Sequence, residues 1–205
     1  MAGTTTNYGW TYPTSTDLVK DGATAIQTAI QGADTSLFSI TNGKNVGLVP
    51  LNTTTFSAQS TVSINSVFSA TYDNYLVVYN ITASSATVVR QRLRVSGTDN
   101  SGSNYLRGGT YVGVYANSAF SSTNNATETF FTLGSTSATV GFGGVLNFIA
   151  PFQTQYTKIT SHSGGADLGL GMCVFNGTTS FDGFTLIPDA GTITGTIRVY
   201  GYRNS

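Results

Sequence analysis

Hydrophobic and polar positions follow one period before residue 47 and another after it. Between residues 17 and 40, apolar side chains are separated alternately by four and three positions. These positions are Val19, Ala23, Ile26, Ile30, Ala33, Leu37 and Ile40. The spacing is a heptad pattern, which predicts an amphipathic helix with one apolar seam. Asp17 and Asp21 are candidate N-caps, because their carboxylates can accept hydrogen bonds from the unpaired N–H groups at a helix start.

Two arrangements are open for this helix. It can lie with its seam on its own domain, or it can pack against copies of itself as a short coiled coil. Gly22 and Gly32 each cost a helix about 1 kcal/mol relative to Ala, so the helix needs a partner surface to persist. Isoleucine at both core positions of the heptad favours three strands over two. The second arrangement therefore predicts a homotrimer with helix contacts at Val19, Ala23, Ile26, Ile30, Ala33 and Leu37.

The segment before the helix, NYGWTYPTSTD, has no period and is rich in aromatic residues. It contains Tyr8, Trp10, Tyr12 and Pro13 within six positions. Aromatic side chains in an extended segment cannot bury one another, and they are enriched at protein interfaces. The segment is expected to dock into another protein chain. The alternative is that its rings fold back over the end of their own domain.

After Gly47 the period changes to two. In the segment SATYDNYLVVYNITA, Tyr75, Val77, Tyr79 and Ile81 fall on one face of a strand. About nine or ten such runs follow, separated by turn-rich segments such as GTDNSGSNY and PDAG. This pattern predicts an all-β, jelly-roll-like antiparallel sandwich. The domain prediction is an N-terminal arm and helix at 1–46 and a β-sandwich at 47–205.

A basic row lies in one of these strands, in the sequence VVRQRLRV at 88–95. The alternation places Arg90, Arg92 and Arg94 on one face, and the other face is apolar except for Gln91. The row could bind an anionic glycan or a lipopolysaccharide phosphate, since Arg binds such groups bidentately. It could also form a subunit contact, or be a solvated outer face that discourages edge pairing. The absence of net charge favours the last two hypotheses.

The overall charge excludes some classes of function. The 205-residue chain has nine acidic and nine basic residues, and only 9% of its residues are charged, against about 25% in an ordinary soluble domain. Nucleic-acid binding depends on clustered excess positive charge, so a nucleic-acid partner is not expected. No apolar stretch approaches the roughly 20 residues of a membrane span, and the first residues lack the pattern of a signal peptide. A neutral chain of this kind is suited to an assembly.

The sequence offers little for catalysis. Cys173 is the only cysteine and is expected to be a buried apolar residue. His162 is the only histidine, so no Cys/His zinc site is possible and no metal or cofactor is expected. The acidic residues in or beside loops could pair for glycoside hydrolysis, but turn formation is their ordinary role. They are Asp99, Glu128, Asp167, Asp182 and Asp189. We therefore predict no catalytic residues.

The loops of the predicted sandwich carry several aromatic residues that could contact a receptor. Tyr105, Tyr115 and Phe120 are the candidates, because Tyr among Asn, Ser and Gly is an adaptable recognition composition. A glycan on a host cell surface is a natural ligand class, since sugar faces stack on aromatic rings. The alternative is that Tyr111 and Tyr115 are half-buried residues of a strand.

Three stretches of the chain, taken together, resemble virion proteins of tailed bacteriophages. The opening NYGWTYPTSTDLVKDGATAIQTAIQGADTSL is similar to the N-terminal segment of fibre or spike proteins, which precedes a short helix. The middle VVRQRLRVSGTDNSGSNY resembles a strand and loop of their β domains, and FDGFTLIPDAGTITGTIRVYGYRNS resembles the closing hairpin. Positions 120–170 match no part of this pattern.

The resemblance implies a non-enzymatic virion protein, made in the host cytoplasm, commonly homotrimeric and attached to other virion proteins by its N-terminus. Tyr8, Trp10, Tyr12 and Pro13 would then anchor the protein to the particle. The first hypothesis is a tail fibre or minor tail spike whose β domain contacts the host surface. The alternatives are a capsid (head) fibre or decoration protein, and a carbohydrate-binding or glycan-hydrolysing β domain.

Overall fold

The structure divides the chain into two compact units. The computed structural model describes residues 3–6, 9–14, 19–41, 47–113, 121–136, 138–165 and 167–204. The first unit ends at Gly47 and the second runs from Leu48 to Asn204. This boundary lies one residue from the predicted one. Each unit has its own packing, so the two are described separately.

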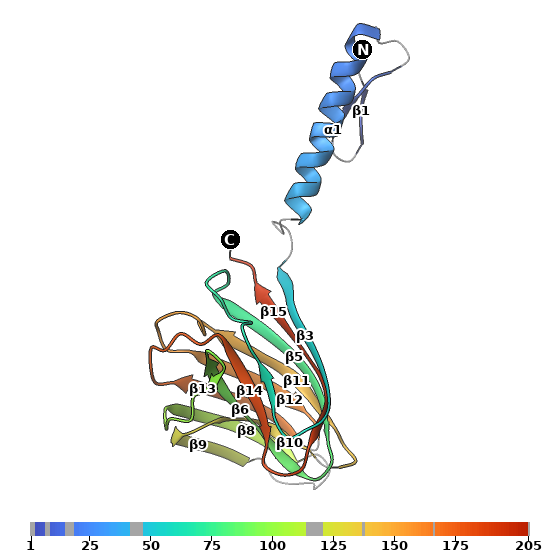
Figure 1. Cartoon of the computed structure of the whole chain (residues 1–205). Coiled ribbons are helices and arrows are strands. Elements are labelled where there is room, and N and C mark those ends of the chain that lie inside the picture. Colours follow the sequence, from blue (N-terminus) through green and yellow to red (C-terminus); the bar gives the residue numbers. More distant parts are fainter. Residues whose placement is uncertain are drawn as a thin grey trace. The chain divides into compact units, whose positions relative to one another are not determined.

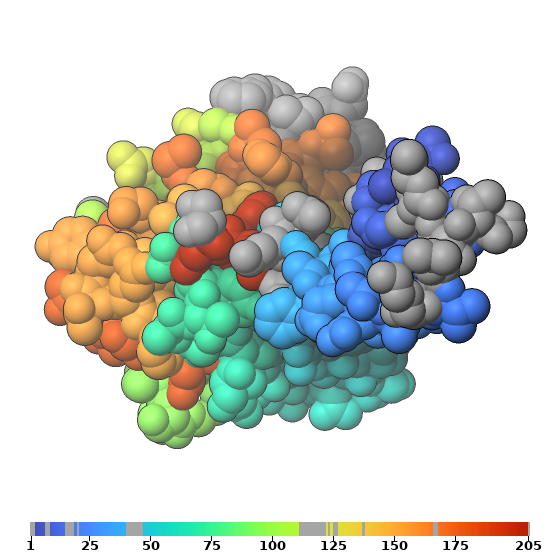
Figure 2. Space-filling model, turned by 90° about the horizontal axis from the view of Figure 1, so that it is seen from above, coloured from blue at the N-terminus to red at the C-terminus, as the bar shows by residue number. Residues whose placement is uncertain are grey.

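The N-terminal unit consists of one helix and a small hairpin. Strands β1 (Gly3–Thr4) and β2 (Thr11–Tyr12) pair antiparallel, and Thr5 donates a backbone hydrogen bond of 2.9 Å to the carbonyl of Trp10. Helix α1 spans Val19–Thr41. Strand β2 packs against the helix, and the hairpin (dark blue) and α1 (lighter blue) lie side by side in Figures 1 and 2.

The hairpin covers the small-residue face of α1. The half-buried residues of α1 are all small, and they are Gly22, Ala25, Ala29, Gly32, Ala33, Ser36 and Ser39. The ring of Trp10 lies against Gly32, where its Cδ1 is 3.0 Å from the position that a Cβ would occupy. By the 3.6-residue period of the helix, most of these residues lie beside the seam, about a quarter turn from its centre. The large seam residues Val19, Ile26, Ile30 and Leu37 remain exposed.

The second unit is a sandwich of two antiparallel sheets (Figure 1), so the predicted all-β sandwich is confirmed. In the described part of the chain, the larger sheet has eight strands in the order β3 (Leu48–Gln59), β15 (Ile193–Tyr202), β5 (Asn74–Ala83), β11 (Phe142–Ile149), β12 (Lys158–Gly164), β13 (Asp167–Phe175), β8 (Tyr105–Gly113) and β9 (Ser121–Glu128). The smaller has β10 (Phe131–Thr136), β6 (Thr87–Val95), β14 (Gly183–Pro188) and β4 (Val62–Ile64), with β7 (Thr98–Asp99) beside β6.

Aromatic side chains fill the space between the sheets. Phe68 and Tyr75 have ring centroids 4.7 Å apart, and Phe148 and Phe184 have centroids 5.3 Å apart. Offset and edge contacts of this kind add to the burial of apolar area. Cys173 is also buried here, as the sequence predicted. The alternation of strands β5, β6 and β15 sends every second side chain into this core.

The two edge strands of the larger sheet have weak patterns in the sequence. Strand β3 reads LVPLNTTTFSAQ and buries only Phe56, and strand β9 reads SSTNNATE. An edge strand pairs on one side only and needs fewer apolar side chains. It can therefore form from Thr, Ser and Asn, which leave no strong period of two.

Candidate functional site

The arginine row lies on the outer face of the smaller sheet. Along β6, Val89, Gln91 and Leu93 are fully buried, and the arginines between them are partly exposed. Gln91 is thus a buried polar exception in the apolar face, as its sequence position indicated. Neither its amide nitrogen nor its amide oxygen has a hydrogen-bond partner within the described residues. The row itself is a feature of strand alternation.

Arg94 connects the strands of the smaller sheet. Its guanidinium forms an ion pair of 2.7 Å with Asp99 and donates a hydrogen bond of 2.6 Å to the Ser63 hydroxyl. It also donates to the Thr185 hydroxyl and to the carbonyl of Gly97. The side chain is only 12% exposed, so these bonds lie largely out of water. Arg94 therefore holds β4, β7 and β14 to β6.

Arg90 and Arg92 also bond within their own chain. Arg90 forms an ion pair of 2.6 Å with Asp189, and its guanidinium carbon is 3.9 Å from the centre of the Phe130 ring. The Nε of Arg92 donates a hydrogen bond of 3.0 Å to the carbonyl of Thr129. The bonds of Arg90 and Arg92 therefore pack the outer face of a single β domain. A subunit contact through the row stays a prediction.

A second arginine, from the larger sheet, reaches the same aromatic ring. Arg107 of β8 forms an ion pair of 3.1 Å with Glu128 and donates a hydrogen bond of 3.1 Å to the Thr132 hydroxyl. Its guanidinium carbon is 5.2 Å from the centre of the Phe130 ring. Phe130 therefore lies within reach of two guanidinium groups, each neutralised by a carboxylate. The Nε atoms of both Arg90 and Arg107 are buried and have no acceptor in the described part of the chain.

A cavity opens beside these groups, along the edge strand β10. Its volume is about 310 Å³. Arg90, Arg107 and Phe130 line one part of it, and Ser161 and Ser163 of β12 line another. Strands β6, β8, β10, β12 and β13 all contribute walls, so the cavity lies between the two sheets.

The cavity exists because inward positions of the larger sheet change from large to small residues. Ser161, Gly171 and Gly109 are register partners on three adjacent strands and face inwards. The neighbouring row on β12 and β13 holds the buried Ile159 and Cys173. Facing strands stay about 10 Å apart, so a row of Gly and Ser leaves space where larger side chains would fill it.

The hydroxyl groups around this region are shifted towards their neutral forms. Burial raises the pKa of the Tyr79 hydroxyl, which has no hydrogen-bond partner within the described residues. Burial also raises the pKa of Tyr105. Tyr105 accepts a hydrogen bond of 2.9 Å from the Leu93 N–H and donates one of 3.1 Å to the carbonyl of Asn100. Tyr105 is therefore a structural hydrogen-bonding group.

Four of the five carboxylates that the sequence offered for glycoside hydrolysis have structural partners. Asp99, Asp189 and Glu128 are ion-paired with arginines, and Asp182 accepts a hydrogen bond of 2.9 Å from the Ser96 N–H. Among the residues that the structure describes, no three His, Cys, Asp or Glu side chains are grouped to hold a metal ion. Within the same residues, no helix is long and apolar enough to cross a membrane.

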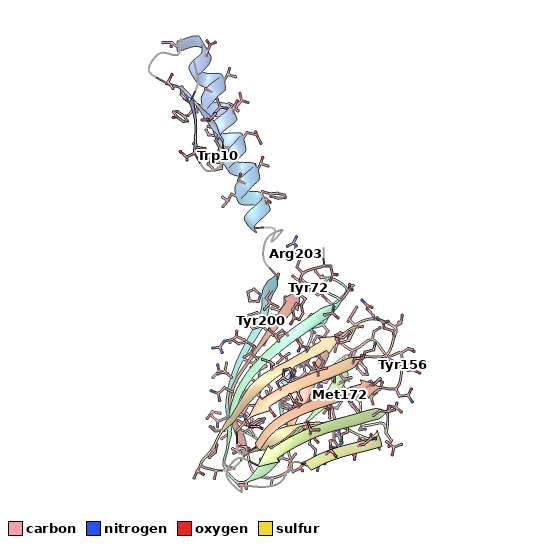
Figure 3. All side chains as sticks on the ribbon, turned by 180° about the vertical axis from the view of Figure 1, so that it is seen from behind. Trp10, Tyr72, Tyr156, Met172, Tyr200 and Arg203 are labelled. Carbon is pink, nitrogen blue, oxygen red and sulfur yellow. The ribbon has the colours of Figure 1, made fainter. Side chains whose placement is uncertain are left out.

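Two exposed apolar surfaces lie elsewhere on the chain. On α1, the seam residues Val19, Ile26, Ile30 and Leu37 are exposed by 97%, 52%, 64% and 62%. On β13, Leu168, Leu170 and Met172 point outwards and are exposed by 55% to 64%. Met172 lies on the broad outer face of the larger sheet (Figure 3), and Leu106 of β8 continues this surface. We call the second set the β13 surface.

The aromatic residues predicted to anchor the chain or contact a receptor have different positions. Trp10 lies between the hairpin and α1 (Figure 3), and the ring of Tyr12, which is 44% exposed, lies over Gly3. Trp10 thus folds back on its own unit, as the alternative hypothesis expected. Pro13 is partly exposed. Tyr8 lies outside the described residues, and an anchoring role for this segment stays a prediction.

Only one of the three receptor candidates lies within the described residues, and it is buried. Tyr105 is fully buried with both hydrogen bonds satisfied inside the domain, so the expectation that it contacts a receptor is wrong. Its position at the start of β8 points it inwards. Tyr115 and Phe120 lie outside the described residues.

The residues that line the cavity were not among those predicted from the sequence. Phe130 and Arg107 are far from the arginine row in sequence, and no local spacing links them to it. The one available signal is the density of Gly and Ser at alternate positions of β12 and β13, where larger apolar residues are expected. That pattern is visible in the segment SHSGGADLGLG.

Comparisons with known proteins add no relative. No protein-family model matches the sequence, and no curated protein matches it. The function is therefore argued from the residues of this chain and from the resemblance of its three stretches.

Proposed function

We propose that this chain is a non-enzymatic structural protein of a bacteriophage virion. It forms a homotrimeric tail fibre or spike, whose N-terminal unit assembles and docks on the particle and whose β domain contacts the host surface. The observation that carries the trimer is the seam of α1. It has the heptad spacing of a coiled coil and no charged residue, and its large side chains Val19, Ile26, Ile30 and Leu37 are more than half exposed.

Large apolar side chains on one face of a helix are stable only when another surface covers them. The hairpin packs on a neighbouring face, which consists of small residues, and not on these large side chains. Two further copies of α1 fit the seam, because Ile26 and Ile30 occupy both core positions of the heptad, a pattern that favours three strands. Coiled-coil packing would bury the same residues in each copy.

The β13 surface supports a second contact between the same copies. Only six residues, 42–47, join the end of α1 to the start of β3. Six residues can span at most roughly 25 Å, so a trimer of helices would hold three β domains close together. Tethering at that distance gives a high effective concentration, at which an uncharged apolar surface associates with a neighbouring copy. We assign the β13 surface to that contact.

The location on the virion separates the fibre proposal from its alternative, a capsid fibre or decoration protein. Deleting residues 1–16 is expected to release the protein from the particle in both cases, and labelling the intact chain would place it at the tail or at the shell. Light scattering on the purified chain tests the trimer directly, with an expected mass of three times 21.4 kDa. A monomer at micromolar concentration would contradict the proposal.

A further inference from the structure

The cavity along β10 is built like a binding site and has no role in the fold. Core cavities in well-packed proteins are small and apolar, because empty space loses dispersion contacts. This one has a volume of about 310 Å³ and is lined by guanidinium groups and serine hydroxyls as well as by apolar side chains. Its volume is at the lower end of the range of ligand pockets, which runs from about 300 to 1,000 Å³. It therefore suits a ligand of a single small ring.

The cavity is lined by two planar donors, the guanidinium groups of Arg90 and Arg107. Each is ion-paired with a carboxylate that is not part of the lining, Asp189 for Arg90 and Glu128 for Arg107. The buried Nε of each arginine has no acceptor within the described residues. An unpartnered buried donor in a native structure calls for an explanation, and a bound oxygen atom is one. Ser161 and Ser163 add hydroxyls that can donate or accept.

The charge of the cavity selects against strongly anionic ligands. Both lining arginines are already neutralised, so a phosphate or a carboxylate would have to displace Asp189 or Glu128, or approach them against repulsion. A neutral ligand with several hydroxyl groups meets no such cost. It can donate to the hydroxyls of Ser161 and Ser163 and accept from the guanidinium groups at the same time.

The cavity also has an apolar wall. Phe130, Val88 and Leu133 line the cavity beside the polar groups. A pyranose ring has a C–H face that packs on apolar surface and a rim of hydroxyls that needs paired donors and acceptors. We infer that the cavity binds one neutral pyranose unit of a glycan, with Phe130 against the ring and the guanidinium groups of Arg90 and Arg107 and the serine hydroxyls on its hydroxyls. This inference concerns the β domain alone and does not require the trimer.

The test uses the full chain and four probes, the methyl glycosides of glucose, galactose, mannose and N-acetylglucosamine. Saturation-transfer NMR is expected to show transfer from the protein to at least one of them, and more than to methyl glucuronide or inorganic phosphate. Phe130→Ala is expected to lower the signal at least tenfold. Tyr156→Ala is the matched control, since it removes an aromatic ring that is 49% exposed and outside the cavity. Thermal melts of both variants check that they fold.

A second variant tests the charge argument. Glu128→Gln keeps the shape of the side chain and removes its charge, so a neutral glycoside is expected to bind about as well or up to threefold more weakly. Because the variant leaves Arg107 without its counter-ion, its affinity for glucuronide or phosphate is expected to rise above that of the wild type, and an unchanged affinity for these anions would contradict the charge argument. The inference is overturned if no neutral glycoside shows transfer, if the anionic probes bind best in the wild type, or if Tyr156→Ala loses as much signal as Phe130→Ala. Light scattering on the same samples reads the trimer independently.

Discussion

The indole ring of Trp10 lies against Gly32 of α1, with its Cδ1 3.0 Å and its Nε1 3.3 Å from the position of a Cβ at residue 32. Glycine is costly inside a helix, by about 1 kcal/mol relative to Ala. At this position it makes room for the only tryptophan of the chain. Gly32 thus lowers the stability of the isolated helix, and the same residue allows the hairpin to pack on that helix.

Replacing Gly32 with Leu is expected to displace the ring of Trp10 and loosen the hairpin. The larger side chain would occupy the space of the indole, so tryptophan fluorescence should shift to longer wavelength as the ring meets water. Gly22→Leu is the matched control, because a Cβ at residue 22 meets nothing within 4 Å. The control should raise helix content with no shift of the emission. An unchanged spectrum in the Gly32 variant would show that the indole does not rely on this glycine.

Ile30→Glu tests the seam of α1. Three glutamates would meet at one core layer of a trimer, and the like charges, once desolvated, would oppose association. The mass by light scattering is expected to fall from three times to once 21.4 kDa. Gln31→Glu adds the same charge at an exposed position off the seam and should leave the mass unchanged. Equal masses for the two variants would place the association elsewhere.

Leu170→Asp tests the β13 surface separately. A carboxylate in an apolar contact between copies is unfavourable, so the variant is expected to weaken the trimer, or to lower its melting temperature, without unfolding the β domain. Thr53→Asp is the control, since Thr53 is exposed on edge strand β3 at the far side of the same sheet. Sedimentation at several concentrations measures the association. If both variants behave alike, the β13 surface is not a contact between copies.

Arg94→Leu is expected to cost about 2–4 kcal/mol of unfolding free energy. It would leave Asp99 without its cation and break the hydrogen bonds to Ser63 and Thr185. Arg92→Leu breaks one hydrogen bond to a backbone carbonyl and should cost about 1 kcal/mol or less. Urea denaturation of both variants gives the comparison. A larger loss at Arg92 than at Arg94 would mean that the row contributes through contacts outside this domain.

Cys173 gives a prediction for pH. Burial raises the pKa of its thiol from 9.0 to about 12, so the folded protein should not react with a thiol reagent at about pH 8 until it unfolds. Because the folded pKa is above the unfolded one, this stabilising contribution is complete below pH 9 and is lost as the pH rises towards 12. Burial of Tyr79 and Tyr105 acts in the same direction. The difference between wild type and Cys173→Ala isolates the thiol, and fast labelling of the native protein would show that it is accessible.

Part of the candidate site was predictable from the sequence. Alternation in VVRQRLRV placed the arginines on one face and identified Gln91 as the exception on the other. Their partners were not predictable, because Asp189 and Thr185 lie about a hundred positions away and reach the row only through the pairing of β14 with β6. Tyr105 was predicted to lie at the surface from composition alone. Its side chain points into the core from the start of β8, so that prediction was wrong.

The sequence by itself determined what depends on neighbouring residues. A period of 3.5 and then of two separates one helix from a β-sandwich, because side-chain direction follows backbone repeat. The low charge likewise argues against a nucleic-acid partner, and this stays a prediction. Only the tertiary structure decided what depends on register between distant strands. The pairing of Ser161, Gly171 and Gly109 opens the cavity, and the docking of Trp10 on Gly32 leaves the seam of α1 exposed. Both results come from packing, because the effect of a side chain's size depends on the residue that packs opposite it.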